Sequence, residues 1–178
     1  MHWIDPLALP VNRGVVAHVF ANSHGELDGL MLRNNQVVHF PPHLSEWIAR
    51  HVRVGDKIAI RGLKARHAGS ITAVSIVAQN GKSIVDEGPH TGTARHKVFA
   101  KPMGPIETQG TVRSPIYGAK GELHGALLDN GVVLRVPPHA APSLVDYLSQ
   151  GASIHARGAG LKGRYGYVID VEELAHWI

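Results

Sequence analysis

Two short basic loops carry the residues of this sequence that are best suited to binding a polyanion. The first reads Lys-Ala-Arg-His at 64–67, and the second reads Lys-Gly-Arg-Tyr at 162–165. Lysine and arginine neutralise phosphates, and a ring stacks on an unpaired base with a contribution of about 1–3 kcal/mol. The pattern therefore predicts binding of single-stranded DNA or RNA. The alternative interpretation is that these loops are basic surface segments that only favour solubility.

Further basic side chains are expected on strands that lead into these loops. Successive side chains of a strand point to opposite faces of the sheet. This alternation directs Arg135 and its counterpart His39 away from the barrel interior, and it directs Arg61 away from the interior as well. Together with the loops, these side chains form a cationic stripe that would follow a nucleic-acid backbone. The complete set of predicted nucleic-acid-binding residues is Lys57, Arg61, Lys64, Arg66, Arg135, Arg157, Lys162, Arg164 and Tyr165.

The two loops recur because the chain contains one sequence module twice. The segment 25–32, Gly-Glu-Leu-Asp-Gly-Leu-Met-Leu, is followed by Pro-Pro-His at 41–43. Related segments stand at 121–128 and 137–139, at a constant offset of 96 residues. An internal repeat settles the domain organisation before any other feature. We predict a first module with an N-terminal extension at 1–78, a linker at 79–108 and a second module at 109–178.

Each module shows the pattern of three strands, a short helix and two further strands. The double proline at 41–42 ends the third strand and suits the first turn of a helix. Gly29 and Gly125 stand in the middle of a strand, where they would relieve the sharp coiling of a small closed barrel. In the first module we expect strands at about 13–22, 26–33, 36–41, 56–62 and 70–78, and a helix at about 43–52. This order is typical of the OB-fold, so we predict a mainly β protein of two tandem five-stranded barrels, each with a short helix between strands three and four.

Two of these motifs also resemble a known family. Gly-Glu-Leu-Asp-Gly-Leu at 25–30 and Val-His-Phe-Pro-Pro-His at 38–43 resemble an uncharacterised bacterial family of OB-fold nucleic-acid-binding-domain proteins. The resemblance covers both modules. It implies the same tandem OB fold and, through the fold, a nucleic-acid ligand.

The composition narrows the classes of function further. The net charge of +4 is modest for 178 residues, and the excess lies mostly in the first module. The absence of cysteine excludes disulfides, thiolate metal sites and cysteine nucleophiles. The N-terminus does not resemble a secretion signal, and no stretch approaches the roughly 20 apolar residues that span a bilayer. We therefore expect a cytoplasmic protein with no membrane partner.

Other functional classes find less support in the residues. We find no phosphate-cradling glycine loop, nucleophile elbow or paired carboxylates, so we predict a non-catalytic protein without a cofactor. A metal site built from histidines is disfavoured because His39 becomes Arg135 in the second module and His43 is separated from His39 by two prolines. His43 and His139 are interpreted as hydrogen-bonding groups at the corner between strand and helix. The main alternative to nucleic-acid binding is a scaffold that binds a protein partner.

Overall fold

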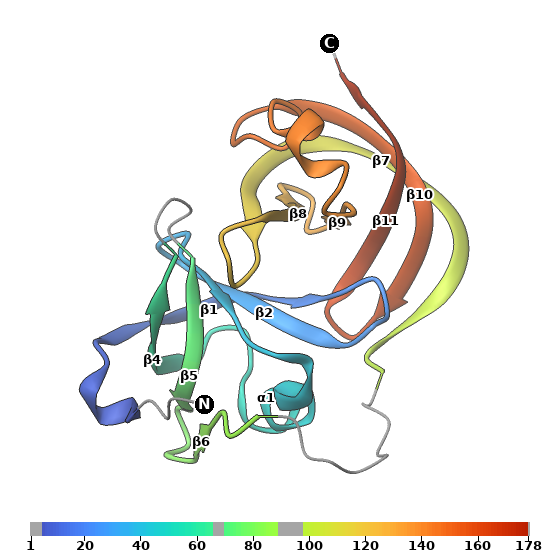
Figure 1. Cartoon of the computed structure of the whole chain (residues 1–178). Coiled ribbons are helices and arrows are strands. Elements are labelled where there is room, and N and C mark those ends of the chain that lie inside the picture. The colour runs from blue at the N-terminus through green and yellow to red at the C-terminus, as the bar shows by residue number, and fades with distance from the viewer. Residues whose placement is uncertain (1–4, 66–69, 89–97, 178) are drawn as a thin grey trace.

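The computed structural model describes residues 5–65, 70–88 and 98–177, which form two β-barrels (Figure 1). The first barrel consists of β1 (Val11–Ala21), β2 (Leu27–Leu32), β3 (Val37–His39), β4 (Lys57–Lys64) and β5 (Ile71–Val77), with β6 (Ser83–Val85) added at its edge. The second consists of β7 (Ala100–Tyr117), β8 (Leu123–Leu128), β9 (Val133–Arg135), β10 (Ser153–Gly163) and β11 (Gly166–His176). The prediction of a mainly β protein is confirmed.

The pairing of the strands is the same in both barrels. In the first, the order is β3-β2-β1-β4-β5, and a parallel pairing of β3 with β5 joins the two ends of this sheet. In the second, β7, β8, β9, β11 and β10 form a closed ring, and its parallel pairing is between β9 and β11. A five-stranded barrel of this strand order is the OB-fold architecture.

The two mid-strand glycines stand where the backbone of a neighbouring strand approaches closely. A Cβ atom on Gly125 would lie 1.7 Å from the carbonyl oxygen of Leu134, and one on Gly29 would lie 3.0 Å from that of Val38. Gly125 also has a φ of 154°. A side chain at position 125 would therefore push β8 and β9 apart.

The helical segment between strands three and four differs between the barrels. The first barrel has the expected helix, as the 3-10 turn η2 (Pro42–Leu44) followed by α1 (Ser45–His51). The second has only the 3-10 turn η3 (Ala141–Leu144), so the prediction of a second helix is wrong in detail. The Ser143 hydroxyl donates to the Ala140 carbonyl and the Ser149 hydroxyl to the Val145 carbonyl, and such bonds compete with a continuous helix. A further 3-10 turn, η1 (Pro6–Ala8), precedes β1, and none of the described helices is long and apolar enough to cross a membrane.

The segment predicted as a linker is shorter than 79–108. β6 extends the first barrel, and β7 already begins at Ala100 and pairs with β10 from its first residue. The turn-forming residues Pro102, Gly104 and Pro105 suggested a linker, yet they lie in a part of β7 that pairs only with β10. Proline is tolerated at such a strand edge, and an irregularity in the pairing beside Gly160 accommodates the bend.

Candidate nucleic-acid interface

The two barrels meet through the outer faces of β2–β3 and β8–β9, which we call the junction. Every residue of β2 is buried, because one side of this strand faces its own barrel and the other faces the second barrel. Asp28 on β2 accepts a hydrogen bond of 2.7 Å from the Nη2 atom of Arg135 on β9. Arg135 also donates from Nε to the Ala21 carbonyl at 3.2 Å. The junction is therefore held by a buried ion pair as well as by apolar packing.

The junction is approximately symmetric, because both barrels use the same positions. In the repeat, Asp28 is equivalent to His124, and His39 is equivalent to Arg135. The Asp28–Arg135 ion pair thus has a symmetry-related counterpart in His39 and His124, whose ring centroids are 6.4 Å apart in an edge-to-face arrangement. The repeat has formed an interface with itself inside one chain, in the manner of a two-fold homodimer.

This arrangement removes Arg135 from the predicted binding stripe. Alternation correctly pointed the side chain away from its own barrel, but only 6% of the residue is exposed, because the first barrel covers it. Its charge is compensated by Asp28. The prediction that Arg135 binds nucleic acid is inconsistent with this burial, since a phosphate would have to displace the carboxylate.

The basic loop of the second barrel also lies at the contact between the barrels. Arg164 donates from Nη1 to the carbonyl of Ala49 in α1 at 3.3 Å, and its guanidinium lies 5.5 Å from the centroid of the Tyr165 ring. Tyr165 packs against the core cluster that both barrels share. Its hydroxyl is buried with no hydrogen-bond partner among the described residues, and burial raises its pKa. Tyr165 is thus placed as a packing residue rather than as an exposed stacking platform.

Two other predicted residues of the second barrel lie on its surface. Lys162 is exposed, with its ammonium 5.4 Å from the centroid of the Tyr167 ring. Arg157 is exposed as well, but its Nη2 atom lies 2.6 Å from a carboxylate oxygen of Glu173. The neighbouring His155 lies 3.2 Å from Glu107. Carboxylates therefore face Arg157 and His155, while Lys162 forms no salt bridge among the described residues.

The first barrel presents a different outer face on β1, β4 and β5. Arg13 on β1 pairs with Ala59 on β4, between Lys57 and Arg61 on that strand. Side chains of directly paired residues point to the same side of a sheet, so these three cations share one face. Arg61 donates to the carbonyls of Leu7 and Leu9 at 3.4 and 2.8 Å, and no described carboxylate forms a salt bridge with it. We call this surface the cationic face.

The cationic face contains a shallow hollow of about 610 Å³. Val15, Ala59 and Val77 contribute apolar side chains to its lining, while Arg13 and Lys57 contribute positive charge. Within the described part of the chain, none of the cations at positions 13, 57, 61 and 64 forms a salt bridge with a carboxylate. The hollow therefore combines an apolar floor with uncompensated cations.

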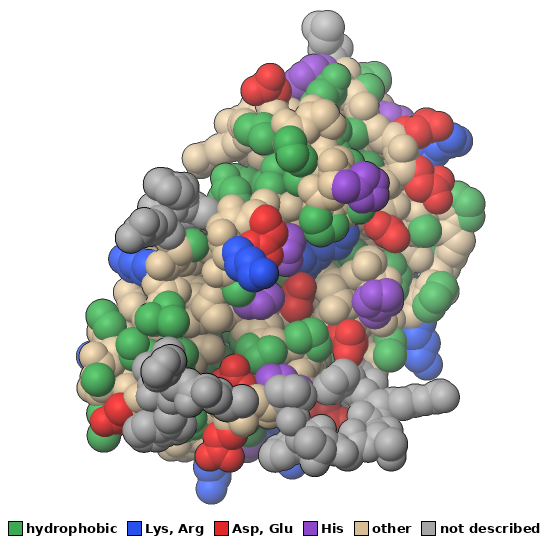
Figure 2. Space-filling view, in the orientation of Figure 1, with side chains coloured by type: hydrophobic (Ala, Val, Ile, Leu, Met, Phe, Trp, Pro, Cys, Tyr) green, Lys and Arg blue, Asp and Glu red, His purple; other side chains and the backbone are tan. Residues whose placement is uncertain are grey.

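Arg13 was missed by sequence reasoning, which looked for cations on strands three and four and on the basic loops. Its position could have indicated this role, because Arg13 stands two residues before Val15 at the start of the first strand. That strand pairs with strand four, which carries Lys57 and Arg61. Lys64 is exposed at the end of β4, and Arg66 lies outside the described residues. On the face of the molecule shown in Figure 2, lysine and arginine side chains lie singly and form no continuous patch.

The remaining histidines and carboxylates do not form a catalytic or metal centre among the described residues. No group of three or more His, Asp or Glu side chains in this part of the chain is placed to hold a metal ion. His43 Nε2 lies 2.7 Å from Asp86, so it ties the corner before α1 to the segment after β6. This is the structural role expected for His43.

Comparisons with known proteins do not identify a family for this chain. No protein-family model matches the chain, and no curated protein matches its sequence. Two solved structures of the single-stranded DNA binding protein from Thermus aquaticus, a deletion mutant and the wild type, are similar to it. Their identities are 11% and 12%, each alignment covers 94% of this chain and 93% or 91% of the other, and the TM-scores are 0.31 and 0.30. TM-scores this low do not establish a shared fold. The fold is therefore assigned from the order and pairing of the strands.

Proposed function

We propose that this protein is a non-catalytic binding protein that takes single-stranded nucleic acid on the cationic face of its first barrel. The observation that carries this proposal is the hollow lined by Arg13 and Lys57 beside an apolar floor. The cations suit phosphates, and the floor suits the flat surface of an unpaired base. Arg61 extends the positive charge along β4 toward Lys64.

The choice of this face follows from the junction. The β2–β3 surface is the usual ligand surface of OB-folds, and here it is buried against the second barrel. On the matching outer face of the second barrel, Arg157 is paired with Glu173, and His155 lies beside Glu107. The cationic face of the first barrel is thus the better surface for a polyanion.

The ligand would be held mainly through its backbone. Valine and alanine side chains provide less stacking than the aromatic rings of strong single-strand binders. We therefore expect modest affinity, little preference for sequence and a strong dependence on salt.

The test is a titration of labelled oligonucleotides followed by fluorescence anisotropy at several salt concentrations. Replacing both Arg13 and Lys57 with Ala removes two phosphate partners. For single strands each lost contact lowers the slope of log affinity against log salt by about 0.7, so the double variant should lose about 1.4 from the slope. Binding at fixed salt should fall as well, because the same contacts supply affinity.

The matched control removes two lysines from the second barrel. Lys101 and Lys162 pair across β7 and β10, and both are exposed. Replacing this pair with Ala changes the net charge by the same amount and should leave the slope almost unchanged. If the salt slope falls equally in both double variants, the total charge of the protein determines binding, and the cationic face does not. A wild-type protein that binds no oligonucleotide at low salt would overturn the proposal.

A further inference from the structure

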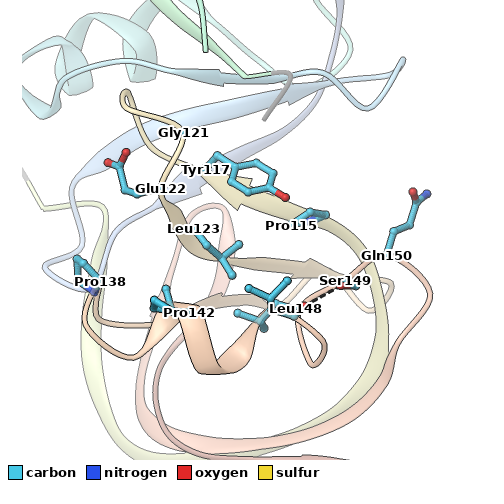
Figure 3. Close-up of a pocket in the computed structure, with 12 residues that line it drawn as sticks. Pro115, Tyr117, Gly121, Glu122, Leu123, Pro138, Pro142, Leu148, Ser149 and Gln150 are labelled. Atoms are coloured by element: carbon cyan, nitrogen blue, oxygen red, sulfur yellow. Dashed lines mark hydrogen bonds between the residues drawn. The ribbon is translucent and has the colours of Figure 1, made fainter. Parts of the chain in front are cut away.

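A groove of about 470 Å³ lies in the second barrel, between the β7–β8 turn and the segment that follows η3 (Figure 3). Leu123 and Leu148 point toward each other in its interior, with Pro142 beside them. Tyr117 and Val145 also line it, and Glu122 contributes a carboxylate. Its volume is within the range of sites that bind ligands. It is separate from the cationic face, and we call it the open groove.

The first barrel has the same groove, but there it is filled by the second barrel. Gly121 and Val145 line the open groove, and their repeat equivalents are Gly25 and Ala49. The carbonyl of Gly25 accepts a hydrogen bond of 2.8 Å from the backbone N–H of residue 99. The carbonyl of Ala49 accepts one of 3.3 Å from the guanidinium of Arg164.

An aromatic side chain lies beside this contact, since the Tyr165 ring centroid is 5.5 Å from the Arg164 guanidinium. Tyr165 is partly buried and packs against a hydrophobic cluster that contains residues of both barrels, with Ala21, Leu27 and Ala49 among its members. These three residues are the equivalents of Tyr117, Leu123 and Val145 in the open groove. The chain thus shows what covers such a groove, namely the segment at 98–100 together with the β10–β11 turn, which presents Arg164 followed by Tyr165.

The difference in exposure between the two grooves is large. Val145 is 51% exposed, whereas Ala49 is 8% exposed. Leu123 is partly exposed and Leu27 is fully buried. Figure 2 shows hydrophobic side chains gathered on the surface near the helical turn of the second barrel. Covering this apolar surface would remove it from water, which is the main driving force of protein association.

We propose that the open groove binds a segment of a partner protein that presents an arginine followed by an aromatic residue at a turn. The aromatic ring would fill the space between Leu123 and Leu148. The arginine would reach the carbonyl of Val145 or the carboxylate of Glu122. The Ser149 hydroxyl donates to the Val145 carbonyl at 2.6 Å, but a carbonyl has a second lone pair that can accept another donor.

A second copy of this chain is a poor occupant by comparison. Its own Arg164 and Tyr165 already contact the first barrel of the same chain. Offering them to a neighbour would require the junction side of that copy to open. The occupant is therefore assigned to a different protein.

The test uses a labelled cyclic peptide with the sequence Leu161–Val168, which copies the turn that fills the first groove. Added to the full chain, it should bind with measurable anisotropy change, and Val145→Glu in the protein should weaken that binding at least about tenfold. Val145 is exposed, so the substitution should leave the fold intact, which circular dichroism would check. The matched control is Val85→Glu, which places the same charge on a 40% exposed valine of the first barrel.

Changes in the peptide test the same idea without altering the protein. In the peptide, replacing the tyrosine that corresponds to Tyr165 with Ala should weaken binding about as much as Val145→Glu does in the protein. Replacing the arginine that corresponds to Arg164 with Ala should weaken binding less. No binding at millimolar peptide, or equal binding by the Val145→Glu protein, would overturn the proposal. So would sedimentation showing a wild-type dimer that Val145→Glu dissociates, because the occupant would then be a second copy.

Discussion

The two symmetry-related contacts of the junction occupy equivalent positions, yet they rely on different chemistry. On one side Asp28 and Arg135 form a buried ion pair with a separation of 2.7 Å. On the other side the same two positions hold His39 and His124, whose rings meet edge to face. The comparison indicates that the duplicated face has been specialised for joining the barrels. Under the proposed function, ligand binding then depends on a surface outside this duplicated face, namely the cationic face.

The largest expected effect comes from breaking the ion pair. Replacing Arg135 with Ala leaves the Asp28 carboxylate buried without its partner, and replacing Asp28 with Ala does the same to the guanidinium. Removing one member of a buried pair costs about 3–5 kcal/mol. We expect a loss of this size in the free energy of unfolding, measured by urea denaturation of each single variant.

An exposed ion pair provides the control for this effect. Arg157 and Glu173 lie 2.6 Å apart, but their side chains are 50% and 66% exposed. Arg157→Ala should therefore cost no more than about 1 kcal/mol. Equal losses in the Arg135→Ala and Arg157→Ala variants would contradict the role assigned to the junction.

The strand order of both barrels was accessible from the sequence, while the junction was not. Alternation and the double prolines placed the strands of the first barrel within a few residues of their observed ends. Alternation also distinguished the inward Val38 from the outward His39. It describes only which side faces the strand's own barrel, however, and not what covers the other side. That is why Arg135 was expected on a binding surface and is found in the junction.

One signal for the junction was present in the sequence. Leu30-Met31-Leu32 in β2 and Ala126-Leu127-Leu128 in β8 place apolar residues on both faces of a strand. Strands with apolar residues on both faces are typically covered on both sides. The start of β7 was obscured for a different reason, since Pro102, Gly104 and Pro105 have the composition of a linker and form a strand only because β10 pairs with them.

A smaller effect is expected on the histidine side of the junction. Burial lowers the pKa of His39; the nearby His124 and Arg135 also lower it, while Asp28 and Glu122 raise it. A histidine whose pKa is lower in the folded state takes up its proton more readily when unfolded. Stability should therefore be lost as pH falls through the unfolded pKa of about 6.5. Denaturation curves at pH 8 and pH 5.5 would measure this loss.

His39→Gln should flatten this pH dependence, because glutamine keeps a polar side chain but does not titrate. His18 will leave a residual dependence, since burial and Arg113 lower its pKa too. His24→Gln is the comparison variant, as this histidine lies in an exposed turn. If the stability of the His39→Gln variant changes with pH as much as that of the wild type, protonation of His39 does not affect the stability of the junction.

The proposed function requires that the junction stays closed while nucleic acid binds to the cationic face. The chain has no cysteine, so His39→Cys and His124→Cys together introduce the only thiols, and a short bifunctional maleimide can bridge them. We predict that the crosslinked protein binds single-stranded oligonucleotides with the affinity of the same variant carrying two capped thiols. Loss of binding on crosslinking would contradict the account, because it would mean that the ligand needs the β2–β3 or β8–β9 faces to separate.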